Sequence, residues 1–162
     1  MQRYAFSADE LCDLLSQSPL FDPQRKDVLT EGIAAWKNDD HVKAIHVLVP
    51  QVEHAVRTMI AQLGLPTTTR GRTSGTLQAR TLGEMLSDEA AKSRLDSNVR
   101  LYLLAVFADP RGVNFRNRVA HGLLEHWEMN RAVSDRIVHA LLVLSGLQPM
   151  SLRGDNETGS VT

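Results

Sequence analysis

The sequence predicts an all-α protein, a helical bundle of five to seven helices. Apolar residues recur at helical spacing along most of the chain, and helix-capping sequences precede several of these stretches. Strand signals are nearly absent. A length of 162 residues fits one domain, expected over residues 1–149, and the polar, Gly/Ser/Thr-rich stretch 150–162 is expected to be a flexible tail.

The first two helices are expected within the first forty residues. Ser7 to Glu10 have the pattern of a capping box, which opens a short amphipathic helix. Asp22-Pro23 supplies a cap and a first-turn proline for the next helix. Their apolar positions are Leu11, Leu14 and Leu15 in the first, and Val28, Leu29, Ile33 and Trp36 in the second.

The longest helix is expected to begin at Asp39-Asp40. Pro50 lies inside it and should kink or split it, and Gly64 should end it. The apolar spacing predicts one buried stripe. This stripe comprises Ile45, Leu48, Val49, Val52, Val56, Met59, Ile60 and Leu63.

Residues 64–80 break the helical pattern. The stretch contains Arg70, Arg72 and Arg80 and no acidic residue, so it predicts a long basic loop.

Helical patterns return after this loop. Thr81 to Glu84 form a second capping box, and the helix over Val99–Ala108 is apolar almost all round, which predicts a central position. Asp109–Gly112 is a turn, and a last helix is expected from about Asn130. That helix would bury Ile137, Val138, Leu141, Leu142 and Leu144.

Composition excludes several classes of protein. A 43% hydrophobic and 23% charged chain is ordinary for a globular domain, and a net charge of -1 excludes a strongly basic nucleic-acid coat but not a local basic site. The single cysteine, Cys12, forbids an internal disulfide and a cysteine-based metal cluster, which indicates a reducing compartment. Without an apolar run of membrane-spanning length or a signal peptide, we expect a soluble, cytoplasmic protein with no membrane partner.

Positive charge is concentrated in the middle of the chain. Residues 1–40 hold eight acidic and four basic residues, whereas residues 53–121 hold six acidic and ten basic residues. Fourteen of the eighteen basic residues are arginine, whose planar fork matches phosphate. The alternative is that these arginines pair with the acidic residues near the N-terminus.

The segment Arg116 to Gly122 gathers the residues best suited to chemistry. If it is helical, Arg116 and His121 are offset by ~140° and displaced by about 7.5 Å along the axis, so their side chains could still converge on one anion. The structural alternative is an arginine that caps a neighbouring helix and a histidine that packs at a turn. No His-Glu-x-x-His pattern occurs, and we expect no metal ion or other cofactor.

This segment reads Arg-Asn-x-x-x-His-Gly, and through it the chain resembles the domain of unknown function 4209 family, which is similar to the HEPN superfamily of helical nucleases and nucleotide-binding domains. Other stretches resemble the same family, so that the resemblance covers about residues 20–148. These stretches are Ala44–His54, Thr67–Thr69, Thr81-Leu82 and Asp109–Asn114. The resemblance implies a HEPN-like bundle, a homodimer and metal-independent ribonuclease chemistry.

The resemblance also implies roles for individual residues. Arg116 would bind the scissile phosphate, and His121 would move a proton of the attacking 2′-hydroxyl or of the leaving oxygen. Asn117 would orient the substrate or His121, and Gly122 would permit close approach of the backbone. The expected RNA-binding residues are Arg118, Arg111, Arg70 and Arg72, although Arg118 fits a surface salt bridge equally well.

Two features depart from the wider pattern. Some superfamily toxins carry a tyrosine two residues after the motif histidine as a modification target, and Leu123 stands there in this chain. Members of the family are often longer, and this chain resembles their C-terminal portion, so it is expected to be either a piece of a longer protein or a short stand-alone form.

Three functions remain open at this point. The first is a metal-independent endoribonuclease, in stress response or phage defence. The second is a non-catalytic RNA- or nucleotide-binding module that uses the same Arg116 and His121 pocket. The third is a helical dimerisation module in which the motif is a polar interface.

Overall fold

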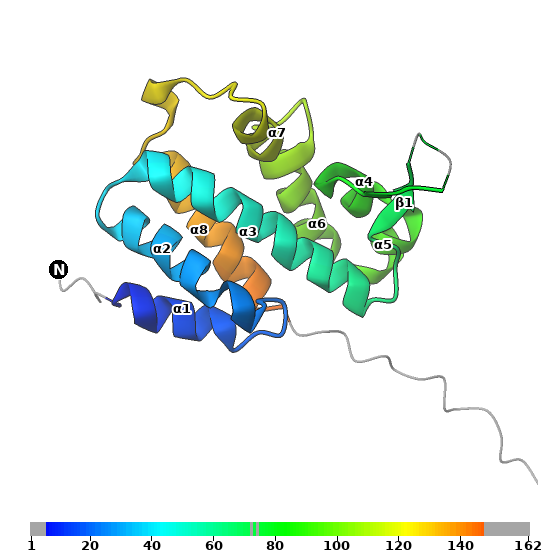
Figure 1. Cartoon of the computed structure of the whole chain (residues 1–162), viewed down its shortest axis with the longest axis horizontal. Coiled ribbons are helices and arrows are strands. Elements are labelled where there is room, and N and C mark those ends of the chain that lie inside the picture. Colours follow the sequence, from blue (N-terminus) through cyan, green and yellow to red (C-terminus); the bar gives the residue numbers. More distant parts are fainter. Residues whose placement is uncertain (1–5, 72, 74, 148–162) are drawn as a thin grey trace, which may run out of the picture.

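The long helix α3 (His41–Gln62) is the element against which most of the other helices pack. In this computed structural model, which describes residues 6–71, 73 and 75–147, α3 lies between two groups of helices (Figure 1). The first group is α1 (Ala8–Ser16), α2 (Lys26–Lys37) and α8 (Arg131–Ser145), and a short 3-10 turn, η1 (Pro23–Arg25), leads into α2. The flexible tail expected over 150–162 lies outside the described residues.

The second group of helices continues the chain on the other side of α3. It comprises α4 (Leu82–Ser87), α5 (Glu89–Arg94), α6 (Ser97–Leu103), the π-helical turn η2 (Leu104–Ala108) and α7 (Phe115–Ala120). A 3-10 turn, η3 (His126–Glu128), then precedes α8. The all-α class is confirmed, and the residues that the structure describes contain eight α-helices.

The number of helices exceeds the expected five to seven because the helix expected from Thr81 is divided at Asp88. Asp88 and Asp96 both have non-helical backbones, and their carboxylates cap the next helix by accepting hydrogen bonds from Ala90 N–H and from the N–H groups of Asn98 and Val99. Asp88 therefore starts a new short helix where the sequence pattern alone suggested one longer helix before that of Val99–Ala108.

The core lies along α3. Every expected residue of its apolar stripe is buried, except Leu63 at the C-terminal cap, which is half-buried. The predicted capping boxes of Ser7 and Thr81 are both present. Gly64 ends α3 as expected, with a backbone φ of 70° that favours glycine.

Pro50 does not split α3, which was one of its two expected effects, since the helix continues to Gln62. Pro50 removes one backbone N–H, so the carbonyl of His46 loses its helical partner. Both residues lie on the exposed face of α3, where water can hydrogen-bond this carbonyl. The free-energy cost of Pro50 in the helix is therefore small enough that packing of the buried face keeps α3 continuous.

The basic loop expected over residues 64–80 contains a hairpin. β1 (Thr68–Arg70) pairs antiparallel with β2 (Leu77–Ala79), and all six residues are exposed. The sequence does not predict these strands, because neither strand has a buried face and no alternation of apolar and polar residues marks them.

The helix expected at the centre of the molecule is buried on one face only. Leu103, Val106 and Phe107 belong to the core, whereas Leu101 and Ala105 are exposed. The stretch Val99–Ala108 thus contributes to the core without being surrounded by it. Its sequence looks apolar all round because the face that is exposed to solvent is also apolar.

Candidate functional site

The motif lies on the short helix α7, which is anchored by one aromatic contact. Phe115 is buried, and its ring meets that of Phe107 edge-on with 6.3 Å between the centroids. Asn114, just before the helix, has a left-handed backbone with a φ of 56°. The buried Phe115 fixes the start of α7 against η2, and the polar motif residues follow on the other faces of the helix.

Arg116 points from α7 to α3, where it pairs with Glu53. Its Nε donates to Glu53 Oε2 at 2.7 Å, and Nη2 is 3.5 Å from Oε1. The side chains of Arg116 and Glu53 are only 26% and 18% exposed. The planar fork of the arginine thus already holds a carboxylate, in the geometry that also suits a phosphate.

Glu53 is shared by a second arginine, Arg57, one turn further along α3. Arg57 Nη2 lies 3.1 Å from Glu53 Oε1. Among the residues that the structure describes, neither Arg57 nor Arg116 forms an ion pair with another carboxylate. Two arginines around one carboxylate leave one positive charge unbalanced at the junction of α3 and α7, which favours the binding of an anion there.

Asn117 contacts Arg116 in this structure. Its Oδ1 accepts a hydrogen bond from Arg116 Nη1 at 3.2 Å, and its Nδ2 donates to Asn114 Oδ1 at 2.7 Å. These contacts hold the guanidinium at Nη1, whereas Glu53 holds Nε and Nη2. The expected role of Asn117 in orienting the substrate or His121 stays a prediction.

His121 is the C-terminal cap of α7, and its side chain is exposed. Within the described part of the chain, no hydrogen bond joins its ring to Arg116 or to Asn117. The structure therefore places Arg116 and His121 on one helix, as the spacing predicted, but it does not bring their side chains together on one protein group. His121 is free to meet a bound molecule or a second protein chain.

Gly122 has a role that the sequence did not suggest. Its φ is 64°, and a Cβ built on it would contact no other part of the described chain within 4 Å. The expected close approach of a backbone stays a prediction. Gly122 N–H donates to Val119 O, and Leu123 N–H donates to Arg118 O, which is the Schellman arrangement that ends a helix. The glycine stops α7 and leaves His121 at its exposed end.

Arg118 forms the salt bridge that the sequence allowed as its alternative. Its Nη2 lies 2.8 and 2.7 Å from the two carboxylate oxygens of Glu128, and the same group donates to the carbonyl of Leu123. This contact, followed by a backbone hydrogen bond from Glu125, lowers the pKa of the Glu128 carboxyl. Arg118 thus ties the segment after the motif to α7.

Of the other expected RNA-binding residues, Arg111 and Arg70 make no described contact with Arg116 or Glu53. Arg111 is 90% exposed and forms a bidentate pair with Asp109, which lowers the pKa of that carboxyl to about 2. Arg70 lies on the exposed strand β1. Arg72 lies outside the described residues. None of the contacts described for Arg70 or Arg111 reaches Arg116.

Glu53 and Arg57 were not among the predicted site residues. Their spacing of four residues on one helix is a signal for an ion pair, but such pairs are common on exposed helix faces. What makes this pair different is the docking of α7 beside it, which places Arg116 against a residue 63 positions earlier in the chain. No local pattern in the sequence indicates that contact.

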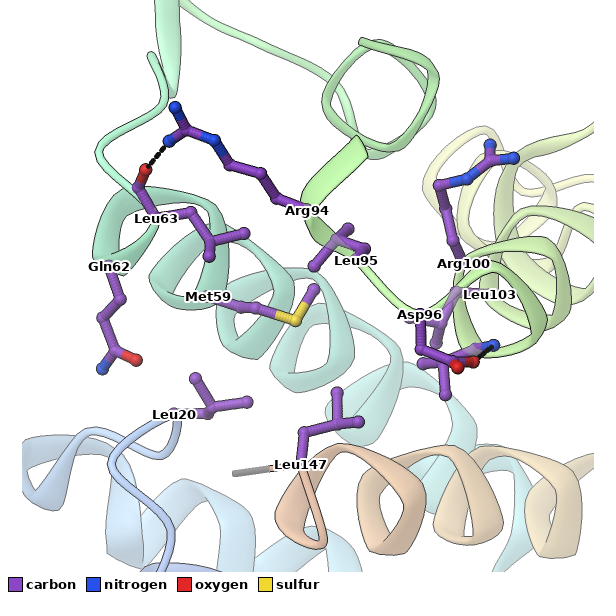
Figure 2. Close-up of a pocket in the computed structure, with 11 residues that line it drawn as sticks. Leu20, Met59, Gln62, Leu63, Arg94, Leu95, Asp96, Arg100, Leu103 and Leu147 are labelled. Carbon is purple, nitrogen blue, oxygen red and sulfur yellow. Dashed lines mark hydrogen bonds between the residues drawn. The ribbon is translucent and has the colours of Figure 1, made fainter. Parts of the chain in front are cut away.

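An apolar cavity of about 140 Å³ lies elsewhere, between α3, α5, α6 and the end of α8 (Figure 2). Its lining includes Leu20, Met59, Leu95, Leu103 and Leu147 but no residue of the Arg116–Gly122 segment. In Figure 2 the guanidinium of Arg94 turns away from the cavity to donate to the carbonyl of Leu63. The cavity is therefore separate from the motif.

Searches for a metal site and a membrane span give no candidate in the described part of the chain. No group of three or more His, Cys, Asp or Glu side chains is arranged to hold a metal ion there. No helix in residues 6–147 combines the length and the apolar character that crossing a membrane requires.

Comparisons with known proteins add no relative. No family model, no curated protein and no solved structure matches this chain. The resemblance to the domain of unknown function 4209 family and to the HEPN superfamily therefore stays a prediction, and the site has to be judged on its own geometry.

Proposed function

We propose that this chain is a HEPN-like, metal-independent endoribonuclease of the domain of unknown function 4209 type, which acts as a cytoplasmic homodimer. The observation that carries the proposal is the unbalanced positive charge of Arg116 and Arg57 around Glu53, where α3 meets the short helix α7 that ends in the exposed His121. An anion site next to an unengaged histidine is the combination that phosphodiester cleavage needs.

In the proposed reaction, Arg116 exchanges Glu53 for the scissile phosphate and stabilises the charge that develops on it. His121 accepts the proton of the 2′-hydroxyl, whose oxygen attacks phosphorus, or supplies the proton that the leaving 5′ oxygen takes. The bond between phosphorus and the 5′ oxygen breaks, and the product carries a 2′,3′-cyclic phosphate. Asn117 holds the Arg116 guanidinium in place during this exchange.

The test is cleavage of single-stranded RNA by the purified protein. His121→Ala is expected to reduce the rate by ~10²–10⁴-fold, because it removes the group that transfers the proton. Arg116→Ala is expected to reduce it by ~10²–10³-fold, because it removes a donor to the developing charge. Cleavage is expected to persist in EDTA and to yield 2′,3′-cyclic phosphate ends.

Controls separate this proposal from loss of the fold. His126→Ala changes another exposed histidine of the same segment and is expected to leave cleavage unchanged. Both active-site variants are expected to melt cooperatively near the wild-type temperature. Wild-type protein that cuts no RNA under any of these conditions would overturn the nuclease proposal.

The second candidate is a non-catalytic RNA- or nucleotide-binding module, or a dimerisation module. The ion pair of Arg116 with Glu53 favours it, because the arginine is already neutralised by a carboxylate of its own chain. RNA that binds through Arg116 and survives intact would support the binding module. If Arg116→Ala changes only the oligomeric state, the motif serves as an interface.

A further inference from the structure

Two arginines hold the base of the hairpin: Arg57 on α3, and Arg80, whose side chain donates to Pro66 O and to Asp88. Arg57 Nη1 donates to the carbonyl of Thr67 at 2.9 Å, and Nη2 donates to the carbonyl of Arg80 at 2.7 Å. These two residues flank β1 and β2, and Arg80 N–H bonds Thr67 O at 3.0 Å between them. A two-stranded ribbon with no buried face is marginal by itself, so Arg57 is important for its position.

The same guanidinium also contacts the carboxylate that neutralises the motif arginine. Arg57 Nη2 shares Glu53 Oε1, while Arg116 Nε holds Glu53 Oε2. All three side chains are partly buried, which reduces screening of their charges by water. Two cations that share one carboxylate compete for it, so a change at either arginine alters the interaction of the other.

We propose that Arg57 and Glu53 are positioning residues that couple the hairpin to the anion site at Arg116. This inference rests on the proposed function, in that Arg116 is taken to receive a phosphate. When the phosphate displaces Glu53, the carboxylate pairs with Arg57 alone and holds that guanidinium, and with it the carbonyls of Thr67 and Arg80, more firmly.

The coupling favours a polynucleotide over a single nucleotide as the ligand. The hairpin exposes Arg70, and the sequence from Gly64 to Arg80 contains no acidic residue. Binding of one phosphate at Arg116 would thus fix a second positively charged element for the neighbouring part of the same polyanion. Coupling is reciprocal, so a phosphate held by the hairpin would also favour release of Glu53 from Arg116.

A first experiment tests the coupling without any ligand. Amide hydrogen exchange of Arg80, normalised to core amides of α3, is expected to slow about two- to fivefold in Arg116→Gln, the factor typical of one partly exposed ion pair. Glu53→Gln is expected to accelerate it by a similar factor. The double variant is expected to behave as Glu53→Gln alone, because Arg116 acts on the hairpin only through Glu53.

Arg118→Gln is the matched control for this experiment. It removes an arginine of the same helix that pairs with Glu128 and not with Glu53, and it is expected to leave Arg80 exchange unchanged. If Arg116→Gln leaves Arg80 exchange unchanged, or if its effect persists in the Glu53→Gln background, the proposed coupling is wrong.

A second experiment measures the binding of inorganic phosphate through the NMR signal of the Arg116 Nε–H group. Arg57→Gln is expected to weaken phosphate binding about two- to fivefold, because Glu53 then pairs with Arg116 alone and competes more strongly with the phosphate. Glu53→Gln is expected to strengthen it, and adding Arg57→Gln to Glu53→Gln is expected to weaken binding by a smaller factor than Arg57→Gln does alone, since only the nearby charge is then lost. Equal loss in both backgrounds would mean that Arg57 acts on the phosphate independently of Glu53, which overturns its positioning role.

Arg57→Lys is a second variant that tests the same residue in case Arg57→Gln does not fold. It retains the charge beside Glu53 but cannot reach Thr67, Arg80 and Glu53 together, so it is expected to free the hairpin while keeping most of the phosphate affinity. The exchange experiment uses no RNA, so failure of the coupling can be distinguished from failure of the nuclease proposal. A protein that shows the coupling but cuts no RNA keeps this inference and loses the nuclease proposal.

Discussion

Gly122 shows how one residue of the motif serves the helix rather than a ligand. It sits in the left-handed region at the end of α7, with empty space where a side chain would point. Gly122→Ala is expected to lower the free energy of unfolding by about 1 kcal/mol, because a Cβ is disfavoured at this φ and no new clash accompanies it. Urea denaturation measures the change.

Gly146 provides the control for this substitution. It caps α8 with a φ of -79°, an ordinary right-handed conformation that alanine also adopts. Gly146→Ala is therefore expected to leave stability unchanged or slightly increased. A loss as large as that of Gly122→Ala would show that backbone conformation is not the cause.

The sequence predicted the placement of single residues well where that placement depends on neighbours in the chain. The sequence placed Arg116, Asn117 and His121 on one short helix, and it offered the salt bridge of Arg118 as an alternative that the structure adopts. The partner of Arg116 was not predictable, because it lies 63 positions away and depends on how α7 docks. For Gly122 the sequence suggested a close approach and not the helix end that the structure shows, because a close approach and a positive φ both favour glycine.

At the scale of the element, the helix α3 contains Pro50 and remains continuous because its other face is packed in the core. Pro50→Ala is expected to raise the free energy of unfolding by about 2 kcal/mol, since alanine restores the hydrogen bond to the His46 carbonyl. The proline side chain is exposed, so little packing is lost. The gain is smaller than the full helix-propensity difference because proline also restricts the unfolded chain.

Pro110 serves as the control for this prediction. It is exposed in the turn after η2, where no helical hydrogen bond is missing. Pro110→Ala is expected to lower stability slightly, by about 0.5 kcal/mol, through the unfolded state alone. Chemical denaturation that shows Pro50→Ala to be neutral or destabilising would mean that the proline fits α3 without cost.

The elements that the sequence predicted well are those with a cap at one end and an apolar stripe. α1, α3 and α8 have both, and the structure confirms them. α2 is also present, but the expected cap Asp22 caps the 3-10 turn η1 that leads into it, and α2 itself has no side-chain cap. The short helices α4 and α5 were expected as one, because Asp88 is an N-cap whose backbone conformation only the tertiary structure reveals. The hairpin has hydrogen bonds from Arg57 to the carbonyls of Thr67 and Arg80, and such long-range contacts leave no periodic pattern.

At the scale of the whole molecule, the segment after the motif bears exposed apolar side chains. Leu123 is 61% and Trp127 is 76% exposed, two and six residues after His121. Together with the superfamily resemblance, they support the proposed homodimer. Light scattering at micromolar concentration is expected to give a dimer, and Trp127→Ser is expected to weaken it because it removes a large apolar contact.

Leu77→Ser tests whether any exposed apolar residue would have the same effect. Leu77 is as exposed as Trp127 but lies on the hairpin, and its substitution is expected to leave the dimer intact. A wild-type monomer at micromolar concentration would contradict the homodimer and weaken the nuclease proposal. A dimer that only Leu77→Ser disrupts would place the interface on the hairpin.

The two tryptophans of the chain have surroundings that differ enough to give separate fluorescence signals. Trp36 is half-buried, and its Nε1 donates to Asp135 Oδ1 at 2.6 Å, which joins α2 to α8. Trp127 faces water in the segment that follows His121. The emission of Trp127 therefore lies at longer wavelength and is open to quenching by iodide, whereas Trp36 is partly shielded. The unlabelled protein thus carries one optical reporter of docking between α2 and α8 and another of whatever binds beside His121.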